Sequence, residues 1–151
     1  MSRPPRIPNW LPWERSTIYF ITLCVEDRKA VLAKPRAWRV CRETLNRLDR
    51  WRILSAVAMP DHLHVIAAPS DREAPVSEFI KWFKRWFNDA YFYSPQSPTW
   101  RWQEGGFDRL LRSEDSLSEK WEYVRQNPVR AGLVADPEEW PYQFQFNEDA
   151  F

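Results

Sequence analysis

The spacing of apolar residues along the chain changes between the two periods that mark strands and helices. Residues 16–25, STIYFITLCV, are β-branched and aromatic, which is typical of a buried strand. Residues 52–59 and 62–68 have the same character, and the turn-forming pair Pro60-Asp61 separates them. These two segments therefore predict a β-hairpin.

Three other segments repeat their apolar residues every three or four positions, as the buried face of an amphipathic helix requires. They cover residues 35–51, 76–90 and 113–126, and Pro128 is expected to end the last helix. Between the second and third helices, residues 99–112 predict a strand that a Gly-Gly pair interrupts.

The expected order is therefore β-α-β-β-α-β followed by a C-terminal helix. This order predicts an α+β, ferredoxin-like antiparallel sheet with helices on one face, and the opposite face is expected to be uncovered. Residues 1–15 are rich in Pro, Arg and Trp without periodicity, so we expect an extended arm there and a single domain over 16–151. The fold alone names no function.

Composition narrows the function classes only partly. The 151 residues contain no long apolar run and no signal-peptide core, so no membrane association and a cytoplasmic, nucleoid-associated location are expected. Cys24 and Cys41 belong to no CxxC motif, so they predict neither a metal knuckle nor a disulfide framework. A net charge of +1 means that any nucleic-acid contact must come from local clusters of basic residues. The ten tryptophans could serve packing or base stacking.

The only two histidines, His62 and His64, lie two positions apart in the segment MPDHLHVI. Side chains alternate between the two faces of a strand, so both imidazoles should project away from the face formed by Leu63 and Val65. Two neutral imidazoles at this spacing could hold one divalent cation. A pair of incidental or structural histidines is the alternative, because His-x-His is a weak signal.

The last helix offers partners for such a cation. Its core stripe is Leu117, Trp121 and Val124, and Tyr123 lies at least about 100° away from that stripe. Asn127 follows one turn later on the side of Tyr123. A cation can neutralise the oxygens of a phosphodiester while a phenol attacks the phosphorus, although Tyr123 could equally be an ordinary surface tyrosine.

MPDHLHVI and YVRQNPVRAGLV together resemble motifs of the single-tyrosine HUH transposases, in which two histidines flank a hydrophobic residue and a later helix carries a tyrosine. The REP-associated tyrosine transposases are the most similar branch, with the motifs MPNHVH and Y-x-x-x-N-P-V-x-A-G-L-V. Further matching segments extend the resemblance from about residue 19 to residue 142. They are IYFITLCVEDRKAVL, VSEFIKWFKRWFN, WQEGGFDRLLR and DPEEWPYQF.

The resemblance implies an enzyme that cuts and rejoins single-stranded or hairpin (REP-like) DNA with Mg²⁺ or Mn²⁺. It implies that His62 and His64 are metal ligands and that Tyr123 forms a 5′-phosphotyrosine. It makes Asn127 the candidate third ligand. It also implies action as a monomer, with a homodimer as the alternative. Position 61 departs from the motif, because Asp61 stands where asparagine is usual and could either charge the metal site or repel the phosphate.

Several basic residues are candidates for phosphate contacts. Three lie on one face of the second predicted helix, two flank Tyr123 and two lie on the N-terminal arm. They are Lys81, Lys84 and Arg85, then Arg125 and Arg130, then Arg3 and Arg6. Solvated charge without a ligand is the alternative for the helix, and a disordered terminus is the alternative for the arm.

Two rival functions remain open at this stage. A catalytically inactive single-stranded nucleic-acid binding module would stack bases on an RRM-like sheet, although the RRM signature is missing from the sequence. A structural domain with incidental histidines would show no salt-dependent affinity for DNA.

Overall fold

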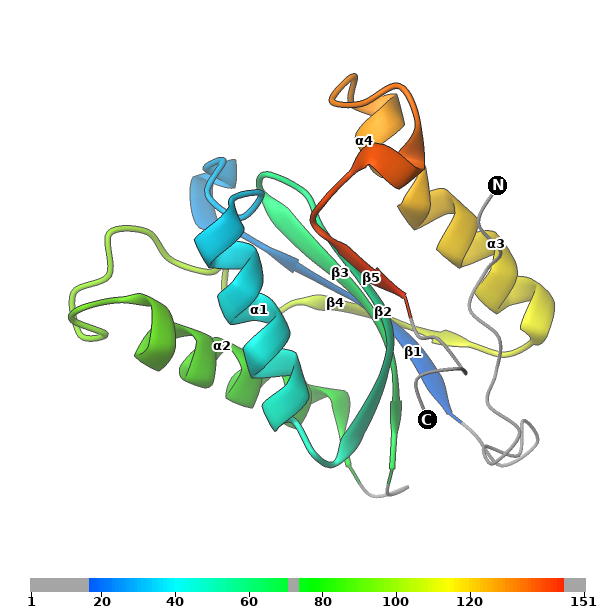
Figure 1. Cartoon of the computed structure of the whole chain (residues 1–151). Coiled ribbons are helices and arrows are strands. Elements are labelled where there is room, and N and C mark those ends of the chain that lie inside the picture. Colours follow the sequence, from blue (N-terminus) through cyan, green and yellow to red (C-terminus); the bar gives the residue numbers. More distant parts are fainter. Residues whose placement is uncertain (1–16, 71–73, 146–151) are drawn as a thin grey trace.

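The structure, a computed structural model, describes residues 17–70 and 74–145 (Figure 1). Its elements are β1 (Ile18–Cys24), α1 (Pro35–Arg47), β2 (Trp51–Ala58), β3 (His62–Pro69), α2 (Val76–Tyr91), β4 (Phe107–Leu111), α3 (Glu114–Arg125), α4 (Asn127–Arg130) and β5 (Gln143–Gln145). Short 3₁₀ turns cover Glu26–Arg28 and Pro137–Glu139. No helix within these two described ranges is both long and apolar enough to cross a membrane.

The strands form one five-stranded antiparallel sheet in the order β4-β1-β3-β2-β5. The first four strands have the order of a ferredoxin-like βαββαβ fold, so the predicted α+β fold class is confirmed. β5 adds a strand that the sequence did not predict, in the tail that was expected to be irregular. It spans only Gln143–Gln145, which is too short for a recognisable alternation.

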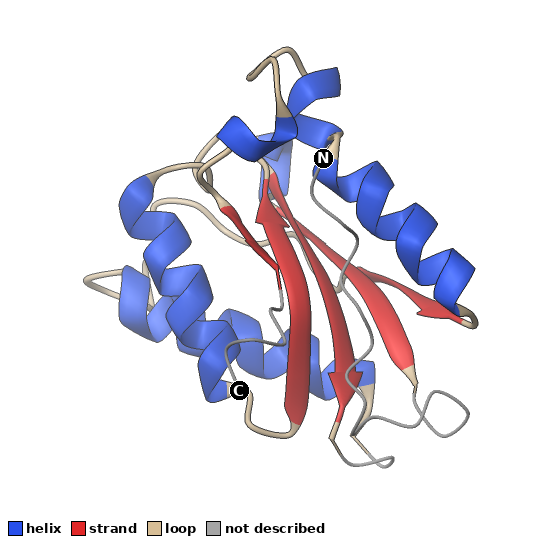
Figure 2. Ribbon diagram, turned by 45° about the vertical axis from the view of Figure 1, so that its right-hand side comes forward, coloured by secondary structure: helices blue, strands red, loops and turns tan. Residues whose placement is uncertain are grey.

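Helices cover the two faces of the sheet unequally (Figures 1 and 2). α1 and α2 pack on one face over a cluster that includes Leu63, Val65 and Ala67, which we call the α2-face cluster. α3 packs on the opposite face over a second cluster that includes Ile66 and Trp121, which we call the α3-face cluster. The expectation of an uncovered second face was therefore wrong, because the apolar stripe of α3 needs a surface to bury against.

Alternation along β3 sorts its side chains between these two clusters. Leu63 and Val65 belong to the α2-face cluster, whereas Ile66 belongs to the α3-face cluster. His62 and His64 share the face of Ile66, because side chains two positions apart point the same way. The predicted alternation is confirmed, and it places both imidazoles on the side of α3.

Some element boundaries differ from the prediction. The first helix ends at Arg47, and Trp51, its predicted last residue, begins β2. The segment 99–112 yields only β4, because Gly105 has a φ of 70° that favours glycine and breaks the strand before Phe107. α3 ends at Arg125, before Pro128 as predicted, but a separate short helix that was not predicted, α4, begins at Asn127. Pro128 lies in the first turn of α4, where a missing backbone N–H costs nothing.

Candidate active site

His64 is fixed in the middle of the sheet. Thr22 lies directly opposite it on β1, and a hydrogen bond joins Thr22 Oγ1 to His64 Nδ1 at 2.9 Å. The imidazole also stacks on Phe20, with 5.0 Å between ring centroids. The side chain is buried, and this burial lowers the pKa of His64 to about 3. His64 is therefore neutral near pH 7, as a metal-binding imidazole must be.

His62 begins β3 beside His64, with 4.6 Å between their ring centroids. Its Nδ1 lies 2.7 Å from Asp61 Oδ1, and Asp61 Oδ2 accepts a hydrogen bond of 2.8 Å from Arg28 Nε. Burial lowers the pKa of His62, against the opposing effect of Asp61. Burial raises the pKa of Asp61, but the hydrogen bonds from Arg28 and His62 bring it below its usual value.

Tyr123 projects from α3 and is 56% exposed to solvent. α3 is held by a Ser113 N-cap and by the buried residues Leu117, Trp121 and Val124, which leaves Tyr123 on the open side as predicted. In Figures 1 and 2 the C-terminal end of α3 lies at the same end of the sheet as the β2–β3 turn, which precedes His62.

Two cations flank the phenol ring. Lys120 Nζ lies 5.4 Å from the ring centroid of Tyr123, and Arg130 Cζ lies 4.1 Å from it. Lys120 Nζ also lies 5.0 Å from the ring centroid of Phe20, the ring on which His64 stacks. Phe20 and Lys120 thus link the tyrosine to the histidine pair. Tyr123 and Lys120 line an open cleft of about 430 Å³ whose other wall is β4.

Asn127 is the least favourably placed of the predicted metal ligands. Its Oδ1 accepts a hydrogen bond from Arg130 Nη2, and the same guanidinium nitrogen donates to the Tyr123 carbonyl at 2.6 Å. No hydrogen bond or ring contact joins Asn127 to either histidine in the described structure. Within residues 17–70 and 74–145, no three side chains of His, Cys, Asp or Glu are grouped for metal binding. The described residues thus offer two metal ligands, His62 and His64, rather than a complete ligand set.

The predicted phosphate-binding residues do not gather on one surface. Arg125 is only 3% exposed, and its Nε lies 3.9 Å from Glu122 Oε2. Its guanidinium is therefore not accessible to a phosphate. Lys84 donates to the carbonyls of Gln103, at 2.8 Å, and Gly105, which engages its ammonium group within the fold. Burial also lowers the pKa of Lys84.

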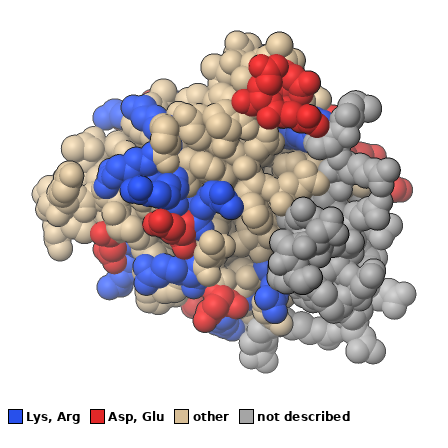
Figure 3. Space-filling model, in the orientation of Figure 1, with Lys and Arg blue, Asp and Glu red and all other residues tan. Residues whose placement is uncertain are grey.

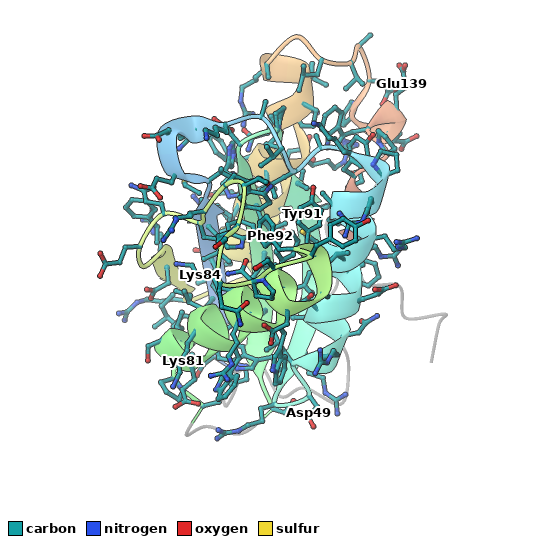
Figure 4. The ribbon with its side chains drawn as sticks, turned by 90° about the vertical axis from the view of Figure 1, so that its left-hand side faces the viewer. Asp49, Lys81, Lys84, Tyr91, Phe92 and Glu139 are labelled. Atoms are coloured by element: carbon teal, nitrogen blue, oxygen red, sulfur yellow. The ribbon has the colours of Figure 1, made fainter. Side chains whose placement is uncertain are left out.

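Lys81 and Arg85 remain exposed on α2, where both lie over the Trp82 ring (Figure 4 labels Lys81). They occupy the side of the sheet opposite the histidines, because α2 covers the other face. On the side seen in Figure 3, Lys and Arg side chains are interspersed with Asp and Glu. Arg3 and Arg6 lie outside the described residues.

Sequence reasoning missed basic and aromatic residues on the histidine side. Arg109 pairs with Phe20 across β1 and β4, and Phe107 pairs with Thr22, the partner of His64. Directly paired residues of antiparallel strands share a face, so both side chains project toward the histidine side. Phe107 is 65% exposed. Lys120 could have been found from its three-residue spacing to Tyr123, whereas Arg109 depends on a strand register that the sequence does not reveal.

Comparisons with known proteins bear on the fold and on the family resemblance. No protein-family model matches the sequence. A Haemophilus influenzae protein provisionally assigned as a REP-associated tyrosine transposase is 22% identical over 143 residues, covering 87% of this chain and 81% of the relative. A solved REP-associated tyrosine transposase bound to a REP hairpin superposes with a TM-score of 0.72 at 20% identity, covering 95% of this chain and 82% of the other.

The resemblance to the REP-associated tyrosine transposases is confirmed. A second solved structure, a provisional transposase of Deinococcus radiodurans R1, has a TM-score of 0.56 at 14% identity and covers 80% of this chain and 95% of the other. At these identities the structural likeness establishes the fold. In the histidine segment, Asp61 replaces the asparagine usual in REP-associated tyrosine transposases, and here it contacts both His62 and Arg28.

Proposed function

We propose that this chain is a metal-dependent transposase that cuts and rejoins single-stranded or hairpin DNA through a 5′-phosphotyrosine. The observation that carries the proposal is the exposed Tyr123 between Lys120 and Arg130, linked through Phe20 to a neutral histidine pair. The relatives support a DNA substrate, since one is a REP-associated tyrosine transposase bound to a REP hairpin.

In the proposed reaction the Tyr123 oxygen attacks the scissile phosphorus. The P–O3′ bond breaks, the phenol loses its proton and the leaving 3′ oxygen gains one, so one strand ends in a 3′ hydroxyl. Lys120 and Arg130 would pair with the phosphate oxygens beside the phenol, and Arg130 would use nitrogens other than the Nη2 that bonds Asn127 and Tyr123. The reverse attack by a 3′ hydroxyl on the phosphotyrosine rejoins a strand without other input of energy.

His62 and His64 would hold the cation, and Mg²⁺ or Mn²⁺ would supply charge neutralisation of the phosphate when bound. Oxygen ligands suit both Mg²⁺ and Mn²⁺, and of these two ions Mn²⁺, a transition metal, is the better match for imidazole nitrogens. Asn127 would complete the set only after its Oδ1 exchanged the hydrogen bond from Arg130 for the cation. As part of the proposal, the enzyme acts as a monomer on DNA in the cytoplasm.

The test is incubation of the purified chain with single-stranded hairpins from the DNA that flanks its gene, with and without Mn²⁺. A 5′-phosphotyrosine places the protein on the 3′ fragment. We therefore expect a 3′-end label to migrate with the protein on a denaturing gel and a 5′-end label to appear on the released fragment. Metal-independent binding without cleavage would instead favour the inactive binding module.

The inactive nucleic-acid binding module has one observation in its favour. The aromatic rings of Phe20 and Phe107 lie on the histidine side of the sheet, as base-stacking rings would. α3 covers part of this face, however, so less of the sheet is open than in an RRM-like platform.

The location of the DNA can be tested by charge removal on each face of the sheet. Lys120→Ala with Arg130→Ala should weaken hairpin binding and reduce the slope of log affinity against log salt by about 1.4, at ~0.7 per lost phosphate contact to single-stranded DNA. Fluorescence anisotropy between low and moderate salt measures the slope. The matched control is Lys81→Ala with Arg85→Ala, which removes the same charge from α2 and should change the slope less. A larger effect of the α2 pair would place the DNA over α2.

A further inference from the structure

We propose that Asp61, held by Arg28, is a positioning residue that keeps the proton of His62 on Nδ1 and so offers Nε2 to a divalent cation. The inference rests on the proposed function for the identity of the bound group. It assigns a role to the aspartate at the position where related motifs carry asparagine.

Donor and acceptor chemistry assigns the proton. Asp61 Oδ1 lies 2.7 Å from His62 Nδ1, and an ionised carboxylate can only accept, so Nδ1 must carry the hydrogen. Arg28 Nη2 lies 3.5 Å from the same Nδ1, but a guanidinium can only donate. The shorter contact, that with Asp61, determines which partner His62 Nδ1 has. Arg28 instead donates its Nε–H to Asp61 Oδ2 at 2.8 Å.

Arg28 is held in place for this contact by its backbone. Asp27 and Arg28 have φ values of 58° and 54°, a left-handed conformation that side-chain-bearing residues rarely adopt. Main-chain hydrogen bonds fix the surrounding segment to the β2–β3 turn, from Val25 N to Asp61 O at 2.9 Å and from Val31 N to Pro60 O at 2.8 Å. Such conformations persist where the surroundings enforce them, often at functional sites.

The contact with Arg28 also bears on whether the negative charge of Asp61 repels a phosphate. The Arg28 guanidinium carries a positive charge that offsets the Asp61 carboxylate at 2.8 Å, so the pair adds no net negative charge beside His62. A carboxylate on the remote nitrogen of a metal-binding histidine fixes its tautomer and increases its basicity as a ligand.

His64 lacks this constraint. Its Nδ1 faces the Thr22 hydroxyl, which can either donate or accept, so the contact does not fix a tautomer. The two histidines therefore differ. Asp61 fixes the tautomer of His62, whereas either tautomer of His64 can bond to Thr22.

The tautomer can be measured without metal or DNA. The chain has two histidines, so the ¹⁵N spectrum of histidine-labelled protein contains two imidazoles, which His64→Gln assigns. We expect the Nδ1–H tautomer for His62 in the native protein and its loss in Asp61→Ala. Arg28→Gln should keep the tautomer, because Asp61 remains. An Nε2–H tautomer of His62 in the native protein would overturn the inference.

Metal affinity supplies the second readout. By calorimetric titration, Asp61→Ala should weaken Mn²⁺ binding about 10- to 100-fold, while Asp61→Asn, which keeps an acceptor, should retain most of the affinity. Asp49→Ala is a matched control, since Asp49 is an exposed turn residue elsewhere in the chain. Unchanged Mn²⁺ affinity in a folded Asp61→Ala protein refutes the positioning role. A native protein with the expected tautomer and Mn²⁺ binding but no DNA adduct refutes the proposed function alone.

Discussion

Replacing Tyr123 with phenylalanine will abolish the covalent protein–DNA adduct and leave hairpin binding nearly unchanged. The substitution removes only the attacking oxygen, so adduct formation should fall by at least about a thousandfold, because the other side chains of the site are not nucleophiles that could replace it. Lys120 and Arg130 stay beside the ring, since their contacts are to its face. The loss of binding free energy should not exceed about 1 kcal/mol, the net contribution of one hydroxyl hydrogen bond.

The measurement is a denaturing gel with 3′-labelled hairpin DNA and Mn²⁺, together with anisotropy on the same hairpin. Tyr93→Phe is the matched control, because Tyr93 is a fully exposed tyrosine outside the candidate site, and this variant should form the adduct at the native rate. If Tyr123→Phe still yields an adduct, another residue is the nucleophile. If it instead loses DNA binding together with the adduct, the hydroxyl has a role in binding.

The features that depend on local periodicity could be predicted from the sequence. The element order followed from apolar spacing, and the placement of His62 and His64 on the same face followed from the two-residue period of a strand. The exposure of Tyr123 followed from its angle to the core stripe of α3. Each of these depends on neighbours within one element.

The features that depend on how elements meet could not be predicted. α3 covers the second face of the sheet, and strand pairing brings Arg109 opposite Phe20. Whether a charged residue is buried or exposed also depends on tertiary packing. Arg125 and Arg130 both flank Tyr123 in sequence, but packing buries the first and leaves the second over the phenol ring. Charge next to a nucleophile in the sequence is therefore weak evidence of charge next to it in space.

Truncation of Trp121 is expected to cause a large loss of stability, because this residue packs α3 against the sheet. Trp121 is 1% exposed in the α3-face cluster, two residues before Tyr123. Trp121→Ala should lower the free energy of unfolding by about 3–5 kcal/mol, because the lost ring leaves a cavity between α3 and the sheet. Urea denaturation with an unchanged m-value measures the loss.

Two variants show whether this loss comes from the anchoring of α3. Trp121→Phe should cost less than half as much, because an aromatic ring remains and Trp121 Nε1 has no hydrogen-bond partner within the described residues. Trp82→Ala removes a half-buried indole from α2, on the opposite face, and should cost less than Trp121→Ala. Equal losses for Trp121→Ala and Trp82→Ala would contradict the anchoring role. At denaturant-free conditions in which Trp121→Ala stays folded, its adduct yield should still fall, because α3 then holds Tyr123 less firmly over the cleft.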